Sequence, residues 1–138
     1  MQIQPYLFFA GRCEEAIGYY QKTLGAKVNF LMRFKESPDP IPPNKLPPGW
    51  KDKIMHGSLQ VGHSTLLLSD GQNAGQPDFR GISLTLSVDS DEQAKLIFTR
   101  LAQNGQINMP LGATFFASSF GMLTDYMGVT WMIIAGQK

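Results

Sequence analysis

The chain has 138 residues, of which 43% are hydrophobic and 17% are charged, a length typical of one domain that buries its own core. The net charge is +1 and no apolar run reaches the roughly 18 residues of a membrane span, so neither nucleic acid nor a membrane is an expected partner. One cysteine and two histidines exclude an internal disulfide and a histidine-rich metal centre, and with no signal segment at the start we expect a cytoplasmic protein.

The first half of the chain predicts a strand, a helix and three further strands. Residues 3–9 are an apolar run, and residues 14–24 carry apolar side chains at helical spacing up to a stop at Gly25. The strands that follow are expected over residues 27–34, 54–61 and 64–69. Gly62 and His63 form the predicted hairpin turn between the last two.

A proline-rich loop is predicted over residues 35–53. Six of the nine prolines fall between Pro38 and Pro48, a density that forbids a helix and does not sustain a strand. Loops of this length often act as lids or binding loops, and a surface insertion without a role is the alternative. Trp50, near the end of the loop, is expected either to close over a pocket as an aromatic lid or to anchor the loop.

The second half repeats the order of the first. Residues 81–88 predict a strand, and residues 89–92 supply capping and first-turn acidic side chains to a helix that stops before Gly105. The next strands are expected over residues 106–109, 114–117, 120–125 and 129–134. The repeat predicts two βαβββ modules, residues 1–75 and 79–138, within one α+β domain of residues 1–138.

Three segments of the chain resemble a known family: PYLFFAGRCEEAIGYYQKTLGA, IMHGSLQVGHSTLLLSD and FGMLTDYMGVTWMI. Together they are similar to the PhnB-like branch of the vicinal oxygen chelate superfamily, which includes glyoxalase I, bleomycin-resistance proteins and extradiol dioxygenases. The resemblance implies paired βαβββ modules that form a cup-shaped mixed sheet around a pocket, with two helices on the outside. It also implies a homodimer, because this superfamily often completes its cups across a two-fold interface.

The metal site of the superfamily is expected to be missing from this chain. The resemblance places three of the family's His and Glu ligand positions at Pro5, Ser83 and Met132. None of these side chains suits a borderline divalent metal. A different set, His56 and His63 with Asp70, is chemically possible, but His63 lies at a turn and is expected to face solvent. We therefore expect no metal and no other cofactor.

Strand alternation divides the side chains between a cup face and a helix face. If the ligand-equivalent positions face the cup, then Tyr6 and Phe8 pack on a helix. The expected ligand-binding residues are Pro5, Leu7, Phe9, Trp50, Ser83, Thr85, Thr130 and Met132. Apolar walls with a few hydroxyls are typical of a small-molecule site, and hydroxyls that face solvent across an open sheet are the alternative.

His56 is the candidate catalytic residue, because its place matches a histidine of the PhnB-like motif. A neutral imidazole there accepts a proton or orients a substrate oxygen, and a structural histidine near a strand end is the alternative. Asp70 and Asp125 are expected to stabilise turns. Cys13, at a predicted helix start, is interpreted as a partly buried thiol without a catalytic role.

The sequence therefore favours a metal-free protein that binds a small molecule of unknown identity. One alternative is an isomerase or lyase that uses His56 as a general base on a small oxygenated substrate. Another alternative is a metal enzyme of the glyoxalase type, which would have to take its ligands from residues other than those in the expected positions.

Overall fold

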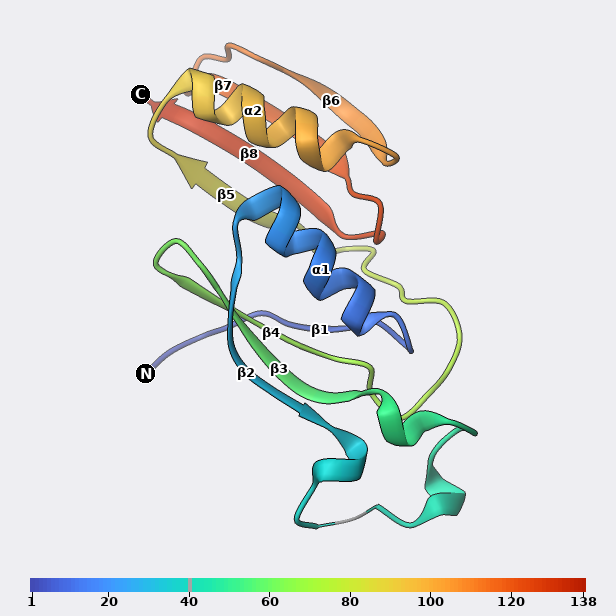
Figure 1. Ribbon diagram of the computed structural model, residues 1–138. Coiled ribbons are helices and arrows are strands. Elements are labelled where there is room, and N and C mark those ends of the chain that lie inside the picture. The colour runs from blue at the N-terminus through green and yellow to red at the C-terminus, as the bar shows by residue number, and fades with distance from the viewer. Residues whose placement is uncertain (40) are drawn as a thin grey trace. The chain divides into compact units, whose positions relative to one another are not determined.

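The computed structural model describes residues 1–39 and 41–138, which divide into two compact units, Met1–Pro77 and Asp78–Lys138 (Figure 1). Pro40, within the predicted loop, lies outside the described residues. Each unit consists of one α-helix and one four-stranded mixed sheet. Neither α-helix of the described chain combines the length and the apolar character needed to cross a bilayer.

The first unit has the predicted order of elements. These are β1 (Tyr6–Phe8), α1 (Cys13–Leu24), β2 (Lys27–Arg33), β3 (Ile54–Val61) and β4 (Ser64–Ser69). The strands lie in the order β1-β4-β3-β2, with β1 parallel to β4 and the other neighbours antiparallel. Helix α1 lies over one face of this sheet (Figure 1), and it ends at Gly25, whose left-handed φ of 66° suits glycine.

The second unit repeats the first. It comprises β5 (Leu84–Val88), α2 (Asp91–Ala102), β6 (Gln106–Gly112), β7 (Ala117–Thr124) and β8 (Thr130–Gln137). The strand order β5-β8-β7-β6, with β5 parallel to β8, is the topology of the first sheet. The predicted α+β fold of two βαβββ modules with mixed sheets is therefore confirmed.

One expectation for the second unit is wrong. Residues 114–117 and 120–125 were expected to form two strands, but a single strand, β7, covers most of this segment. The hydroxyl of Thr114 accepts hydrogen bonds from the backbone N–H groups of Phe116 and Ala117. Because of this local turn, the strand begins only at Ala117, and from there β7 pairs with β8.

The helices are held against their sheets by apolar stripes at helical spacing. In α1 the buried stripe includes Ala16, Ile17 and Tyr20, and in α2 it includes Ala94, Phe98 and Leu101. Gly121 of β7 makes the approach of α2 possible, because a Cβ atom there would lie 2.7 Å from the Phe98 ring. The close packing of α2 on its sheet therefore depends on glycine, which has no side chain, at position 121.

The proline-rich loop is ordered by short turns and ion pairs. Its three 3₁₀ turns are Phe34–Glu36, Pro43–Lys45 and Trp50–Asp52. Both terminal nitrogens of Arg33 donate to the Glu14 carboxylate of α1, each at 2.9 Å, and Nη1 also donates to the carbonyl of Asp52 at 2.7 Å. The guanidinium holds the pKa of Glu14 below its usual value. The two ends of the loop are thus tied to each other and to the helix.

A buried carboxylate, Asp70, organises the first unit. It is 1% exposed, and its Oδ1 accepts hydrogen bonds from the backbone N–H groups of Gly11 and Cys13 at 2.8 and 2.7 Å. Its Oδ2 accepts from the N–H of Ile54 at 2.8 Å. The N-cap residue Arg12 makes no side-chain capping bond, so Asp70 supplies the cap of α1 from the end of β4. The expected local turn role of Asp70 is therefore wrong.

The substitution Asp70→Ala tests this arrangement. It leaves two buried N–H groups and one partly buried N–H group without an acceptor, so we expect the free energy of unfolding to fall by about 3 kcal/mol. Asp70→Asn keeps one carbonyl acceptor and should lose less. Both values come from urea denaturation at neutral pH.

Asp39→Ala is the matched control, because that carboxylate is exposed in the loop. We expect its effect to stay within about 0.5 kcal/mol. If Asp70→Ala unfolded at the same urea concentration as Asp39→Ala, the capping role of Asp70 would be contradicted.

Candidate functional site

Four rings form a row across the face of the first sheet that α1 leaves open. Tyr6 and Phe8 come from β1, His56 from β3 and Phe30 from β2. Ring centroids lie 5.0 Å apart for Tyr6 and Phe8, 5.5 Å for Tyr6 and His56, and 5.7 Å for Phe30 and His56. Tyr6, Phe8 and Phe30 are exposed at 38%, 54% and 45%. This ring row is an accessible aromatic surface with one imidazole in it.

The ring row contains a specific hydrogen bond. The Tyr6 hydroxyl lies 2.7 Å from Nδ1 of His56. Burial raises the pKa of Tyr6 above 10.0, so the hydroxyl keeps its proton at neutral pH. A protonated hydroxyl can donate to Nδ1, and we assign it that role; in this assignment the imidazole carries its proton on Nε2. His56 is left with one free ring group, an N–H donor.

The structure corrects the expected faces of β1. Leu7 and Phe9 were expected to line the cup, but they are 6% and 0% exposed, and the Phe9 ring contacts Tyr20 of α1 with centroids 6.4 Å apart. Tyr6 and Phe8, expected on the helix side, lie on the open face. Since β1 is apolar on both faces, alternation alone gives no polarity from which to choose between them.

The second sheet has an open face of hydroxyl and thioether groups. Thr85 of β5 pairs with Met132 of β8, and Thr130 lies on the same side two residues before Met132. Their neighbours Trp131 and Ile133 are 5% and 0% exposed. Ligand binding by Thr85, Thr130 and Met132 stays a prediction.

Ser83 and Pro5 both lie just outside a strand. Ser83 precedes β5, and its buried hydroxyl oxygen has no hydrogen-bond partner within the described part of the chain. Pro5 precedes β1 and is exposed, and its carbonyl accepts a hydrogen bond from the N–H of Leu67 at 3.1 Å.

The donor set at the family's metal positions does not fit a divalent metal of the borderline class. Pro5 offers no side-chain donor, Met132 offers a thioether and Ser83 offers a neutral hydroxyl. The histidines are also separated in role, since His56 belongs to the ring row and His63 is exposed at the hairpin turn. Among residues 1–39 and 41–138, no group of three or more His, Cys, Asp and Glu side chains is placed to hold a metal ion.

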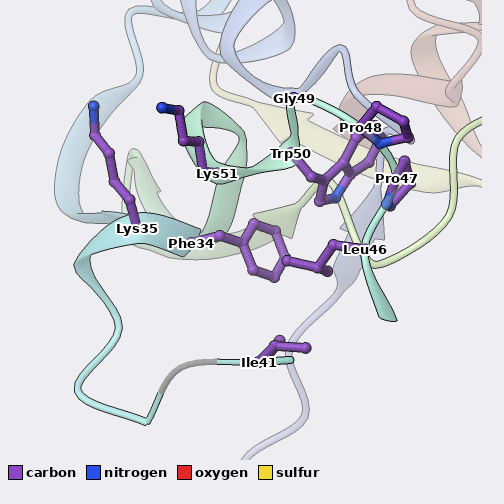
Figure 2. A pocket seen from close by; sticks show the side chains of 9 residues that line it. All are labelled: Phe34, Lys35, Ile41, Leu46, Pro47, Pro48, Gly49, Trp50 and Lys51. Atoms are coloured by element: carbon purple, nitrogen blue, oxygen red, sulfur yellow. The ribbon is translucent and has the colours of Figure 1, made fainter. Parts of the chain in front are cut away.

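Trp50 anchors the proline-rich loop. Its side chain is 6% exposed, its Nε1 donates to the carbonyl of Gly71 at 2.7 Å, and its ring packs on Gly11. The indole also lines a pocket of about 540 Å³ that the loop forms within itself (Figure 2). Of the two roles expected for Trp50, the structure therefore places it as an anchor.

Asp125 and Cys13 have structural roles. Oδ1 of Asp125 accepts hydrogen bonds from the N–H groups of Met127 and Val129 at 2.8 and 3.0 Å, which confirms the expected turn role, and its Oδ2 accepts from Trp131. Cys13 is fully buried, and burial together with the nearby Asp70 charge raises the pKa of its thiol. A thiol in that state is a poor nucleophile.

Sequence reasoning singled out His56 as a candidate but did not predict the rings that surround it. Phe30 was placed on an alternating strand, yet no pattern distinguished it from its neighbours. Tyr6 was assigned to the wrong face. The evidence for its true face lies in the strand order, in which β4 lies between β1 and β3. The pairing of β1 with β4 joins residues about 60 positions apart, which local periodicity does not report.

Comparisons with known proteins place the chain among related folds. Residues 2–133 match the family model of the Glyoxalase/Bleomycin resistance protein/Dioxygenase superfamily. The chain is 38% identical to Protein YjdN of Escherichia coli (strain K12), over 96% of this chain and 94% of that protein. It is similar to protein PA1353 from Pseudomonas aeruginosa, with 43% identity, a TM-score of 0.85 and coverage of 100% and 99% of the two chains. The PhnB protein from Bacillus cereus is 26% identical, with a TM-score of 0.79 and coverage of 99% and 100%.

The hydrogen bond between Tyr6 and His56 predicts one tautomer. In long-range ¹H–¹⁵N spectra at a pH where His56 is neutral, we expect its proton on Nε2. Tyr6→Phe removes the donor to Nδ1 and should give a mixture of both tautomers. Tyr126→Phe, in the second unit, is the control and should leave the His56 signals unchanged. A dominant Nδ1–H tautomer in the unaltered protein would contradict the assignment.

Alkaline pH gives an independent check on Tyr6. Folding raises the pKa of this hydroxyl, so its contribution to stability is complete below pH 10 and is lost as the pH rises through the raised value. We expect the free energy of unfolding to fall more steeply above pH 10 in the unaltered protein than in Tyr6→Phe. Equal slopes in urea denaturation across this range would show that the hydroxyl is not shielded by folding.

Proposed function

The chain belongs to the Glyoxalase/Bleomycin resistance protein/Dioxygenase superfamily, and within it we propose that this protein binds a small molecule without a metal, on the ring row of its first sheet. The observation that carries the proposal is the hydrogen bond between Tyr6 and His56 within an exposed set of rings. It joins flat apolar surfaces to one oriented polar group, which is the usual make-up of a small-molecule site.

The chemistry of the ring row indicates the class of ligand. Tyr6, Phe8 and Phe30 offer ring faces and edges on which a flat, unsaturated body stacks. His56, with Nδ1 occupied by Tyr6, offers Nε2–H to a carbonyl, carboxylate or other oxygen acceptor. The ligand is therefore a small conjugated or aromatic molecule that carries an oxygen acceptor.

The same hydrogen bond favours binding over catalysis by His56. A general base needs a ring nitrogen with a free lone pair near its substrate. With the assigned tautomer, the Nδ1 lone pair accepts from Tyr6 and Nε2 carries the proton, which leaves no free basic nitrogen on the ring. An isomerase or lyase that uses His56 as a base would first have to break its bond to Tyr6.

The glyoxalase-type metal enzyme is the less supported alternative. Its chemistry needs a metal held by donors such as imidazole or carboxylate. The resemblance assigns those donors to the positions of Pro5, Ser83 and Met132, whose side chains are neither imidazoles nor carboxylates.

A homodimer is part of the proposal. Apart from Asp125, no charged side chain occurs between residues 101 and 137. Ile107 and Met109 on the edge strand β6, together with Phe115, are exposed at 51%, 43% and 91%. Apolar exposure on an edge strand with little charge supports an interface with a second copy of the chain. Light scattering coupled to size exclusion measures the mass, and a monomer at all concentrations would contradict this part.

Ligand-dependent thermal stability tests the proposed function. We expect a panel of small conjugated carbonyl and carboxylate compounds to contain at least one that raises the melting temperature. A free ligand at about 100 times its Kd stabilises a protein by about 2.7 kcal/mol. Loss of one hydrogen bond worth about 1 kcal/mol should weaken binding roughly fivefold in His56→Ala.

His63→Ala is the matched control, because this histidine is exposed at the hairpin turn. It should bind the compound as the unaltered protein does. The proposal loses its support if no compound raises the melting temperature, or if His56→Ala and His63→Ala bind equally well.

A further inference from the structure

The proline-rich loop forms an open pocket of its own, lined by other residues than the ring row. It has a volume of about 540 Å³, within the range of roughly 300–1,000 Å³ found for small-molecule sites. Its lining is apolar apart from the two lysines and the backbone, and consists of Phe34, Lys35, Ile41, Leu46, Pro47, Pro48, Gly49, Trp50 and Lys51 (Figure 2). It shares no residue with the ring row, so ligand binding in this pocket can be tested independently of the function proposed above.

The walls of this loop pocket are held in place by hydrogen bonds and by burial of two of its aromatic side chains. The indole of Trp50 is fixed by the hydrogen bond from its Nε1 to the Gly71 carbonyl. The backbone N–H of Trp50 donates to the carbonyl of Pro47 at 3.2 Å. Phe34 is 8% exposed, and its N–H donates to the carbonyl of Lys53 at 3.1 Å. Pro47 and Pro48 restrict the backbone on the same side. A pocket with fixed walls binds without a large ordering cost.

The charges at the loop pocket are unbalanced. Lys35 is paired with Asp52, with Nζ 2.9 Å from the carboxylate. Lys51 makes no salt bridge within the described residues, although its charge, like that of Lys35, helps to lower the pKa of Asp52. No acidic residue lines the pocket. Figure 2 shows the amino groups of Lys35 and Lys51 extending to the same side, beyond the apolar side chains. One edge of the pocket is thus cationic and its interior is apolar.

We propose that the loop pocket binds a small organic anion with an apolar body, such as an aryl-substituted carboxylate. The anionic head lies at Lys51, and the body lies against Phe34, Leu46 and Trp50. An apolar body gains from leaving water, and the Trp50 indole offers a face on which a ring packs. The carboxylate meets an amino group that needs to break no existing ion pair.

The two indole N–H signals of the protein give a direct readout. Trp50 lines the loop pocket, and Trp131 lies in the second unit, bonded to Asp125. In ¹H–¹⁵N spectra, we expect 3-phenylpropionate to shift the Trp50 signal in a saturable way and to leave the Trp131 signal in place. The uncharged analogue 3-phenylpropan-1-ol should bind about three- to tenfold more weakly, as expected for one partly exposed charge pair.

Lys51→Met and Lys45→Met are matched variants. Both remove one charge from the same loop, but Lys45 does not line the pocket. We expect Lys51→Met to bind 3-phenylpropionate about three- to tenfold more weakly and to bind the alcohol as before. Lys45→Met should bind both compounds like the unaltered protein, and so should His56→Ala, which alters only the ring row.

Three outcomes would overturn the proposal. The first is a Trp50 signal that neither compound shifts. The second is equal binding of the acid and the alcohol by the unaltered protein. The third is equal weakening by Lys51→Met and Lys45→Met, which would indicate a general effect of net charge instead of a head group held at Lys51.

Discussion

The carboxylate of Asp70 is the interaction on which the first unit depends. It stands at the end of β4 and accepts hydrogen bonds from the turn before α1, from the first turn of α1 and from the start of β3. The start of α1, the start of β3 and the end of β4, which are distant in sequence, therefore meet at one buried side chain. Because β1 pairs with β4 and His56 lies two residues after Ile54, this junction also places Tyr6 and His56 within hydrogen-bonding distance. The Trp50 anchor binds the carbonyl of Gly71, next along the chain. The end of β4 therefore supports both the ring row, through Asp70, and the loop pocket, through Gly71.

The two units have the same topology but different chemistry. Helix α1 is capped from a distance by Asp70, whereas α2 is capped locally by Ser90, whose hydroxyl accepts from the N–H of Gln93. Asp91 of α2 accepts hydrogen bonds from the hydroxyls of Ser118 and Ser119, which lower its pKa. The open face of the first sheet carries rings, and that of the second carries hydroxyls and a thioether. A repeated topology therefore supports two unlike surfaces.

Family membership explains the topology more than the chemistry. The chain matches the superfamily model across residues 2–133, and its two modules share one strand order. The resemblance assigns the metal positions to Pro5, Ser83 and Met132, so the chemistry has to be argued from the residues that are present. Those residues are a tyrosine that stays protonated, a histidine with one nitrogen occupied, and flat apolar rings around them. Such a set is better suited to holding a molecule than to moving its protons.

The sequence by itself determined the βαβββ repeat, both helices and the hairpin of residues 54–69, because helical spacing, capping residues and turn glycines act over a few neighbouring positions. Only the tertiary structure decided which face of β1 is open, since Tyr6, Leu7, Phe8 and Phe9 are all apolar enough for either side. It alone joined Tyr6 to His56 and made Asp70 a cap for α1, because strand pairing and the burial of a charge are settled by segments about 50 to 60 residues apart. Local pattern reports which side chains alternate, and only packing against the helix reports which of them face the solvent.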